Sequence, residues 1–376
     1  MKRVVYVPIV KGKKNDIVAV GSLSEAVRSV TKPLIEAMPM KPKKPQSLEE
    51  HIYRFCDYIC KHVPLGQIFV DFYGLMPDAC VDEGTNGTLF GFQILRGLGR
   101  EATPVYGLER NDDIWDGLAN VVAASNKGFA FRLRYEDLAE DLIPETWGAI
   151  IERSAQIGVS ESQVDLILDF ASLSRYEPDE IKETVISFLF HNPRVHLYRS
   201  IVVAASSALK DVSGIEKEDM TEVRRGELYL WSDLWNDMPD GVKPIYGDYG
   251  VVHPDFSDIG PNQNMNAKIR YTVGDKILYF RGHGLLRPQK DFGQYYDLAK
   301  RVTADRRCKT RDHSVGDTYL HDCARRLTKT PGSPATWVRA DMNHHVTYVA
   351  QQVRRLVDEF ASLPDATDAA SLLSEV

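Results

Sequence analysis

The stretch VDLILDF at Val164–Phe170, with PDEIKETVISFLF at Pro178–Phe190 and YRSIVVAA at Tyr198–Ala205 after it, decides the fold. The two outer runs are apolar with little polar alternation, which is typical of strands that are covered on both faces. The middle run has the apolar spacing of a helix. A strand, a crossover helix and a second strand indicate parallel pairing.

The same alternation extends outward to about residue 255. Eight strands are predicted, at Val4–Val10, Pro33–Glu36, Gln67–Phe72, Thr103–Leu108, Phe129–Leu133, Val164–Phe170, Tyr198–Ala205 and Pro244–Tyr249. Seven helices separate them, at Ile17–Val30, Leu48–Val63, Leu89–Leu98, Asp112–Ser125, Ile143–Ile157, Pro178–Phe190 and Met220–Trp235. This pattern predicts a (β/α)₈ barrel of the TIM type. An open doubly wound sheet is the alternative, but the turn at Lys11–Lys14 lacks the glycine-rich phosphate motif of that fold.

The pattern changes after residue 255. Ile269–Thr272 and Lys276–Arg281 predict a hairpin. Helices are predicted at Gly293–Asp305, Asp317–Leu327 and Ala335–Phe360, and we expect the last to pack against the barrel. We therefore divide the chain into a barrel (1–258), a basic α+β appendage or lid (259–345), and a C-terminal helix with a frayed tail (346–376).

Charge is unevenly distributed along the 376 residues. Residues 266–345 contain 16 Lys/Arg and 8 Asp/Glu, a net charge of +8. Since the whole chain has a net charge of −7, the remaining residues together carry −15. The appendage is expected to meet an anion, a nucleic acid or the barrel itself, or simply to be a solvated surface. No segment has the length of a membrane span or the form of a signal peptide. The five cysteines lack zinc-site spacing, so we expect reduced thiols in a cytoplasmic protein without a membrane partner.

Polar residues stand at the end of every predicted strand, where barrel enzymes place their active sites. They are Lys11, Glu36, Asp71, Glu109, Arg132 with Arg134, Asp169, Ser206 with Ser207, and Asp248 with Tyr249. As catalytic candidates we take Lys11, Glu36, Asp71, Asp169 and Asp248. As substrate-binding candidates we take Arg132, Arg134 and Tyr249. The alternative is a ring of salt bridges that closes the mouth of the barrel.

Three chemistries are open at such a site. The four carboxylates could hold a divalent cation, Mg²⁺ or Mn²⁺, while Lys11 and Arg132 bind a substrate phosphate, as in metal-assisted phosphodiester cleavage. Metal-free acid–base catalysis is equally compatible with these residues. A Schiff base on Lys11 is the third possibility. The sequence does not select among them.

The appendage contributes two further candidates. Arg281, within Arg281–Gly284, is expected to act as a lid residue that reaches the mouth of the barrel. His344 belongs to the run Asn343–His345, and adjacent histidines on a helix point in different directions. We take His344 as a ligand-binding candidate, with a structural hydrogen bond as the alternative.

These motifs also carry a family resemblance. Val7–Lys13, Pro33–Glu36, Gly247–Tyr249 with His253-Pro254, Ile269–Thr272, Arg281-Gly282, Gly316-Asp317 and Asn343–His345 resemble the Beta protein family of phages and bacteria, in the same order. The sequence differs from that pattern at Asn15-Asp16, where a Glu usually follows the Lys-Gly-Lys segment. The resemblance implies a phage-associated or antiviral-defence setting and no particular reaction.

Three functions follow as hypotheses. The first is a hydrolase that acts on a nucleotide or nucleic acid at the mouth of the barrel, under the appendage. The second is a non-catalytic phage or defence protein that binds a partner protein. The third is a nucleic-acid-binding protein without catalysis, contacting a backbone through residues such as Tyr295 and Arg306–Lys309. The oligomeric state is left open.

Overall fold

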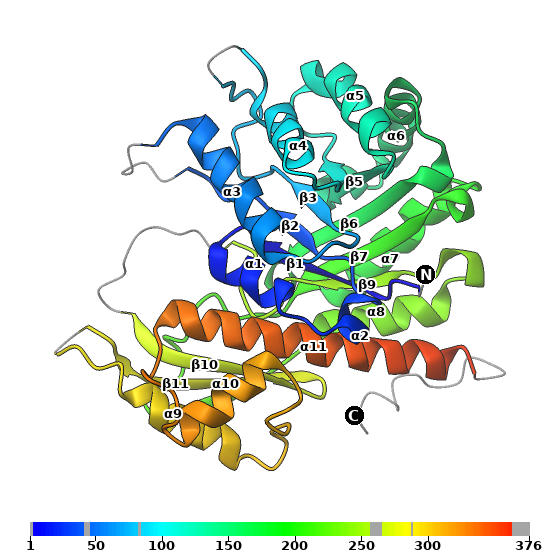
Figure 1. Cartoon of the computed structure of the whole chain (residues 1–376). Helices are drawn as coiled ribbons and strands as arrows, with labels where there is room; N and C mark the ends of the chain where they lie inside the picture. Colours follow the sequence, from blue (N-terminus) through cyan, green and yellow to red (C-terminus); the bar gives the residue numbers. More distant parts are fainter. Residues whose placement is uncertain (1–2, 41–45, 82–83, 256–264, 287–288, 363–376) are drawn as a thin grey trace.

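The computed structural model describes residues 3–40, 46–81, 84–255, 265–286 and 289–362. Its centre is a closed barrel of eight parallel strands, which confirms the predicted fold (Figure 1). The strands are β1 (Tyr6–Lys11), β2 (Leu34–Glu36), β3 (Phe69–Asp71), β4 (Thr103–Tyr106), β5 (Phe129–Arg134), β6 (Val164–Ser172), β7 (Ser200–Ser206) and β9 (Ile245–Asp248). The barrel closes where β1 pairs with β9, with Tyr6 opposite Tyr246.

Helices surround the barrel in chain order. They are α1 (Lys14–Gly21), α2 (Glu25–Arg28), α3 (Leu48–His62), α4 (Gly87–Gly97), α5 (Trp115–Ser125), α6 (Ile143–Ile157), α7 (Pro178–His191) and α8 (Gly226–Asp237). The first predicted helix is divided in two, because Ser24 caps a new helix by accepting a hydrogen bond from the backbone of Val27. Within the described ranges, no helix combines the length and hydropathy needed to cross a membrane.

The helix predicted at Met220–Trp235 is wrong over its first residues. Met220–Arg224 forms a strand, β8, which pairs antiparallel with β11 (Lys276–Gly284) outside the barrel. This strand satisfies the backbone groups along one edge of β11, a requirement set by a distant segment that local periodicity does not contain. The helix α8 then begins at Gly226.

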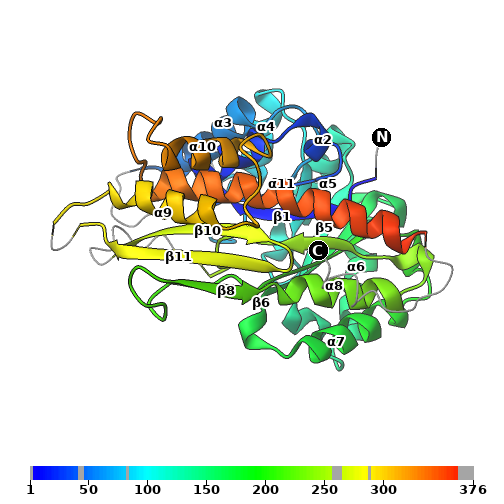
Figure 2. The same cartoon turned by 90° about the horizontal axis from the view of Figure 1, so that it is seen from below.

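The appendage is a three-stranded sheet packed against helices. The strands lie in the order β10 (Asn266–Val273), β11, β8, and run side by side in Figure 2. One face packs against α9 (Gln294–Ala304), α10 (Val315–Ala324) and the first turns of α11 (Pro334–Phe360). The predicted hairpin and all three predicted helices are present.

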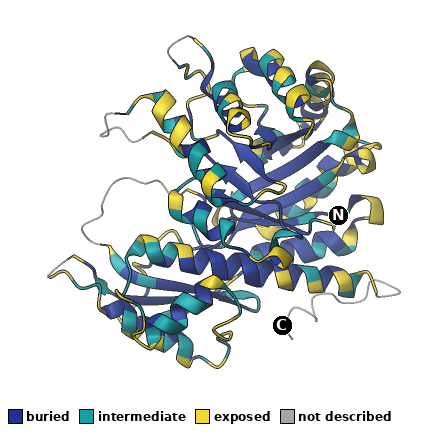
Figure 3. Ribbon diagram, viewed as in Figure 1, coloured by how far each residue is buried: buried dark blue, intermediate teal, exposed yellow. Residues whose placement is uncertain are grey.

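The long helix α11 serves both parts of the molecule. Residues including Val346, Val349 and Val353 belong to the barrel's hydrophobic core, whereas Trp337 and Ala340 belong to the core of the appendage. The middle of α11 is buried, as Figure 3 shows. α11 therefore occupies the place of the eighth barrel helix, and the chain builds β10, β11, α9 and α10 between β9 and this helix.

This arrangement bears on the predicted domain limits. The limit at 345/346 falls inside α11, and β8 comes from within the range 1–258 but joins the sheet of the appendage. The limit at 258/259 lies outside the described residues.

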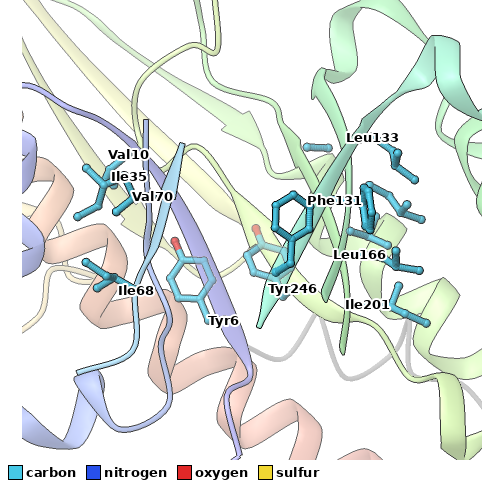
Figure 4. Close-up of a cluster of buried hydrophobic side chains, with 14 of the residues drawn as sticks. Tyr6, Val10, Ile35, Ile68, Val70, Phe131, Leu133, Leu166, Ile201 and Tyr246 are labelled. Carbon is cyan, nitrogen blue, oxygen red and sulfur yellow. The ribbon is translucent and has the colours of Figure 1, made fainter. Parts of the chain in front are cut away.

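Alternation along the strands separates two cores. Side chains such as Tyr6, Val10, Leu166 and Tyr246 point outward to the helices and form the cluster drawn in Figure 4. The inward side chains form a second apolar layer inside the barrel, made of Val7, Ile9, Leu34, Phe69, Val105, Ala130, Ile167, Val202, Ala204 and Tyr249. One step further along the strands, the inward positions carry charge.

Asn343 ties three elements together and provides a test of how α11 is held. Its amide nitrogen donates to the carbonyl of Ala19 in α1, and its oxygen accepts from the backbone N–H of Gly316 in α10, both at 2.9 Å. Asn343→Ala should lower the free energy of unfolding by about 1–3 kcal/mol, because the Gly316 N–H loses its acceptor, whereas the Ala19 carbonyl still accepts from the Ser22 N–H. Urea denaturation measures this. Gln351→Ala, at an exposed position of the same helix, should change stability by less than about 0.5 kcal/mol.

Candidate functional site

The guanidinium of Arg132 lies at the centre of the barrel mouth. Its Nε and Nη2 lie 2.8 and 2.7 Å from Asp169 Oδ2, and its Nη1 lies 2.6 Å from Asp71 Oδ2 and 2.8 Å from Glu36 Oε2. Nη2 also donates to the hydroxyl of Tyr249 at 2.9 Å. The Arg132 side chain is 0% exposed. One buried cation thus joins three strands of the barrel to the residue that follows β9.

Two more cations complete the ion pairs of these carboxylates. Lys11 Nζ lies 2.6 Å from Glu36 Oε1. Arg110 makes a two-pronged contact with Asp71, with Nη1–Oδ1 at 2.7 Å and Nη2–Oδ2 at 3.1 Å. Bidentate geometry of this kind is the strongest form of the Arg–carboxylate pair.

Arg134 and an aromatic ring cover the cluster from above. Arg134 Nη1 lies 2.6 Å from Asp169 Oδ2. The ring of Tyr73 lies 4.6 Å from the guanidinium carbon of Arg134, 5.1 Å from that of Arg110 and 5.4 Å from that of Arg132, distances suited to cation–π contact. We call Glu36, Asp71 and Asp169 the rim carboxylates, and Lys11, Arg110, Arg132 and Arg134 the rim cations.

The rim cations keep the rim carboxylates ionised. Burial alone would raise the pKa of Asp169, but the guanidinium groups of Arg134 and Arg132 outweigh burial and hold its pKa far below the usual range. The pKa values of Glu36 and Asp71 are lowered in the same way, against the effect of burial. Each rim carboxylate therefore stays charged at neutral pH and is unsuited to donate a proton.

These contacts bear on the three chemistries left open by the sequence. Every rim carboxylate already contacts a Lys or Arg, and Asp248 lies elsewhere, so the set expected to hold Mg²⁺ or Mn²⁺ does not fit a divalent cation. Lys11 already contacts Glu36 through its Nζ, so this nitrogen is not free to attack a carbonyl and form a Schiff base. Burial, and then the Asp169 carboxylate, raise the pKa of Tyr249, whose hydroxyl donates to Asp169. The observed contacts match the salt-bridge alternative.

The structure brings seven of the ten predicted site residues together. They are Lys11, Glu36, Asp71, Arg132, Arg134, Asp169 and Tyr249. The other three lie away from the mouth, each for a different reason.

Asp248 lies on the outer face of the barrel wall. It follows Gly247 and precedes Tyr249, and alternation turns its side chain toward α11. There it accepts a hydrogen bond from the hydroxyl of Tyr6 at 2.6 Å and lies 2.9 Å from Nε2 of His345. Burial would raise the pKa of Asp248, but His345 lowers it below the usual range.

Arg281 and His344 belong to the appendage. The guanidinium of Arg281 donates to the backbone carbonyls of Ser213 (3.0 Å) and Ile215, so it anchors the segment before β8 and does not reach the mouth. His344 is buried, with Nδ1 2.8 Å from Asp317 Oδ2 and Nε2 2.8 Å from the carbonyl oxygen of Thr272. The two adjacent histidines do point in different directions, His344 into the appendage and His345 toward the barrel.

A cavity of about 200 Å³ opens above the rim. Lys11, Arg134, Asp169 and Tyr249 line its floor, and Arg175, Tyr135 and Tyr176 are among its outer residues. Its charged lining is mixed, with three Lys/Arg and four Asp/Glu. This mouth cavity has no excess of positive charge.

A larger groove of about 590 Å³ lies beside it, between the barrel and the appendage. The described residues that line this groove include seven cations and one carboxylate: Lys11, Lys13, Lys14, Arg54, Lys210, Lys268 and Arg270, with Asp16. Lys11 belongs to both the groove and the mouth cavity. The excess of positive charge lies in the groove.

Comparison with known proteins shows the family of this chain. A model of the Beta protein family matches residues 6–351. The chain belongs to this family. No curated protein matches the sequence significantly. Among solved structures, triosephosphate isomerase from Bartonella henselae aligns with a TM-score of 0.36 and 10% identity, over 67% of this chain and 95% of that chain.

Some site residues of this Beta family member escaped the sequence reasoning. Arg110 follows Glu109, the residue assigned to the end of the fourth strand, so an error of one position hid it. Asp16 and Lys268 were missed because they come from opposite ends of the chain. Burial raises the pKa of Asp16 to about 6 against the opposing effect of Lys13, and burial followed by Arg270 lowers the pKa of Lys268 to about 8. The difference from the family pattern at Asn15-Asp16 was the one feature of the sequence that pointed to Asp16 as a residue of interest.

Arg132→Met tests whether the ion cluster holds the barrel together. Three buried carboxylates would lose a partner, so the free energy of unfolding should fall by about 3–5 kcal/mol near pH 7. In the wild type, the low pKa values give stability that is present above about pH 4 and lost as the pH falls. The deficit of the variant should therefore shrink toward about pH 4, as the stranded carboxylates take up protons.

Denaturant unfolding across this pH range measures the deficit. Arg153→Met, which removes an ion pair with the exposed Asp112 (2.9 Å), is the matched control and should cost no more than about 1 kcal/mol. A deficit for Arg132→Met that is small or independent of pH would contradict this account of the cluster.

Proposed function

We propose that the groove binds a phosphate-bearing ligand, a nucleotide or a short stretch of nucleic acid. The observation that carries the proposal is the ratio of seven Lys/Arg to one Asp in the described lining of the groove. Cations gathered in a concave site attract phosphates both at long range and in direct contact. The volume of about 590 Å³ lies within the usual range for small-molecule sites.

The groove also offers a surface for a base. Tyr58 and Val338 are among its lining residues, and base–aromatic stacking is the usual sequence-tolerant contact of nucleic-acid-binding sites. Lys14 lies 5.8 Å from the Tyr58 ring, so a cation and an aromatic face are neighbours there. This mixture suits a nucleotide better than it suits inorganic phosphate.

The shared residue Lys11 suggests how a ligand would lie. A phosphate in the groove near Lys11 leaves the mouth cavity free for the next group of the ligand. Arg134 and Arg175 line that cavity. The proposed site is thus one surface with a basic groove and a charge-balanced end.

A hydrolytic reaction needs a group that exchanges a proton near neutral pH, and the rim carboxylates do not supply one. Asp16 does, because burial raises its pKa to about 6 and it lines the groove. We propose Asp16 as the general base if the ligand is a substrate. Without turnover, the same groove makes the protein a nucleic-acid- or nucleotide-binding component, which fits the phage or defence setting that the family resemblance implies.

Charge reversal in the groove tests the binding proposal. Lys14→Glu and Lys210→Glu replace exposed cations at the groove, and each should weaken binding of a labelled single-stranded oligonucleotide. Each lost phosphate contact should reduce the slope of log K against log salt by about 0.7. Fluorescence anisotropy over a salt series measures both effects, with mononucleotides as competitors.

Lys300→Glu provides the control. Lys300 is exposed on α9 and does not line the groove, so this substitution makes the same change of charge outside the site. Equal losses for the three variants would indicate attraction by net charge alone. Salt-independent affinity in the wild type would rule out a phosphate-dominated site.

Asp16→Asn separates catalysis from binding. The variant keeps the shape of the side chain, so oligonucleotide affinity should be retained, whereas any hydrolysis should fall by about 10²–10⁴-fold. Wild-type activity should rise as the pH increases through about 6, because the base acts in its ionised form. Product release from a panel of nucleotides and oligonucleotides is the measurement. Absence of turnover in the wild type, with binding intact, would leave the binding function alone.

Measuring the stability of Asp16→Asn tests whether the variant has a folding defect. The raised pKa of Asp16 means that ionising it costs stability as the pH rises from about 4 to about 6. Asn carries no charge, so Asp16→Asn should unfold at the same or a higher denaturant concentration near pH 7.

A further inference from the structure

A group of metal-ligating side chains lies in the appendage, away from the groove and the mouth cavity. It consists of His313, just before α10, Asp317 in the first turn of α10, and His344 in the middle of α11. One ligand atom from each lies within 4.8 Å of the other two. Asp317 and His344 are buried, and His313 is half-buried.

The hydrogen bonds of His344 show that something must lie between its Nδ1 and the carboxylate of Asp317. Its Nε2 faces the carbonyl oxygen of Thr272, which can only accept, so Nε2 carries a proton. Its Nδ1 then faces a carboxylate oxygen of Asp317 at 2.8 Å. Two lone pairs cannot face each other at this distance. A hydrogen atom between the ring nitrogen and the carboxylate, or a metal cation bound by both, satisfies the two atoms.

His313 distinguishes the two possibilities. Its Nε2 is buried and has no hydrogen-bond partner among the described residues. An ion pair between His344 and Asp317 gives this nitrogen no role. A cation shared by Asp317 and His344 gives it one, as the third ligand.

Neighbouring residues hold two of the candidate ligands in place through hydrogen bonds. Thr272 orients His344 through its carbonyl, an arrangement that metal-binding histidines commonly use. Asp317 accepts hydrogen bonds from the hydroxyls of Tyr271 (2.8 Å) and Ser314 (2.6 Å). Each carboxylate oxygen thereby has a partner that holds it in place.

We propose that His313, Asp317 and His344 bind a divalent transition-metal ion. Two imidazoles and one carboxylate suit Zn²⁺, Co²⁺ or Ni²⁺ better than Mg²⁺ or Ca²⁺. Three protein ligands leave at least one coordination position for water or another small ligand. The bound ion joins the loop before α10, α10 itself and α11. It thereby holds the helices of the appendage to the helix that completes the barrel.

Titration of the full, untagged chain with Co²⁺ and Zn²⁺ after treatment with a chelator tests the proposal. The wild type should bind one equivalent, give the visible absorption of Co²⁺ held by protein ligands, and release a proton when His344 exchanges it for the metal. His313→Ala should weaken binding by more than the ~10–100-fold that loss of an outer-shell partner costs. His321→Ala changes a half-buried histidine in α10 that is outside the proposed site, and it should leave the affinity unchanged.

Folding is controlled by circular dichroism of the metal-free proteins, where His313→Ala should match the wild type because no hydrogen bond to its Nε2 is lost. The proposal is wrong if the wild type takes up neither ion. It is also wrong if His313→Ala and His321→Ala lose the same affinity. A His344 ring that keeps both protons in ¹⁵N spectra with Zn²⁺ present would mean that the site is an ion pair only.

Discussion

A permanent positive charge on Arg132, fully buried at the barrel axis, is the constraint on which the mouth of this barrel depends. Removing such an ion from water costs several kcal/mol, and the cost is offset only where well-placed opposite charges surround it. The carboxylates that do so come from β2, β3 and β6, and the Tyr249 hydroxyl comes from the end of β9. Those strands must therefore keep their register relative to β5.

The position of α11 is the second determinant. The chain leaves the barrel after β9, builds the appendage, and returns with the helix that closes the outer ring. The appendage cannot swing freely, because one helix belongs to the hydrophobic cores of both parts. Asn343 and His345 on that helix each contact both the barrel and the appendage, whereas His344 contacts the appendage. The groove between the two parts accordingly has fixed walls, one from the β1–α1 segment and one from β10 and α11.

Patterns within single segments were enough to predict the barrel, the hairpin and most helices. The end of each strand was also predictable to within a residue or two, and seven candidate residues meet there. The failures follow from what a segment does not contain. Asp248 and Tyr249 are adjacent, and only the direction of the pleat decides which one points inward. β8 exists because β11 has an edge to pair, and Arg281 is fixed by carbonyls of a loop 66–68 residues away. The net charge of the appendage pointed to it as the anion-binding part, yet five of the seven groove cations come from the barrel. Arg307 and Arg311 of the appendage are instead paired with its own carboxylates or with Glu222 of β8.

Burial raises the pKa of the carboxylates at both sites, but nearby cations outweigh burial only at the mouth, and this difference separates their chemistry. At the mouth, burial is accompanied by direct ion pairs, so Glu36, Asp71 and Asp169 are held in their charged form. In the groove, Asp16 is 2% exposed, and burial outweighs the nearby cations, so its pKa rises to about 6. An ion-paired carboxylate of the first kind stabilises the structure but exchanges no proton near neutral pH. A carboxylate of the second kind, with a raised pKa, can exchange a proton in that range. The ion pairs of the barrel mouth therefore leave none of these three carboxylates able to exchange a proton near neutral pH. Asp16, where burial is not fully offset by the nearby cations, lies in the first turn of α1 and lines the groove, so the carboxylate suited to the proposed proton exchange is separate from the ion cluster.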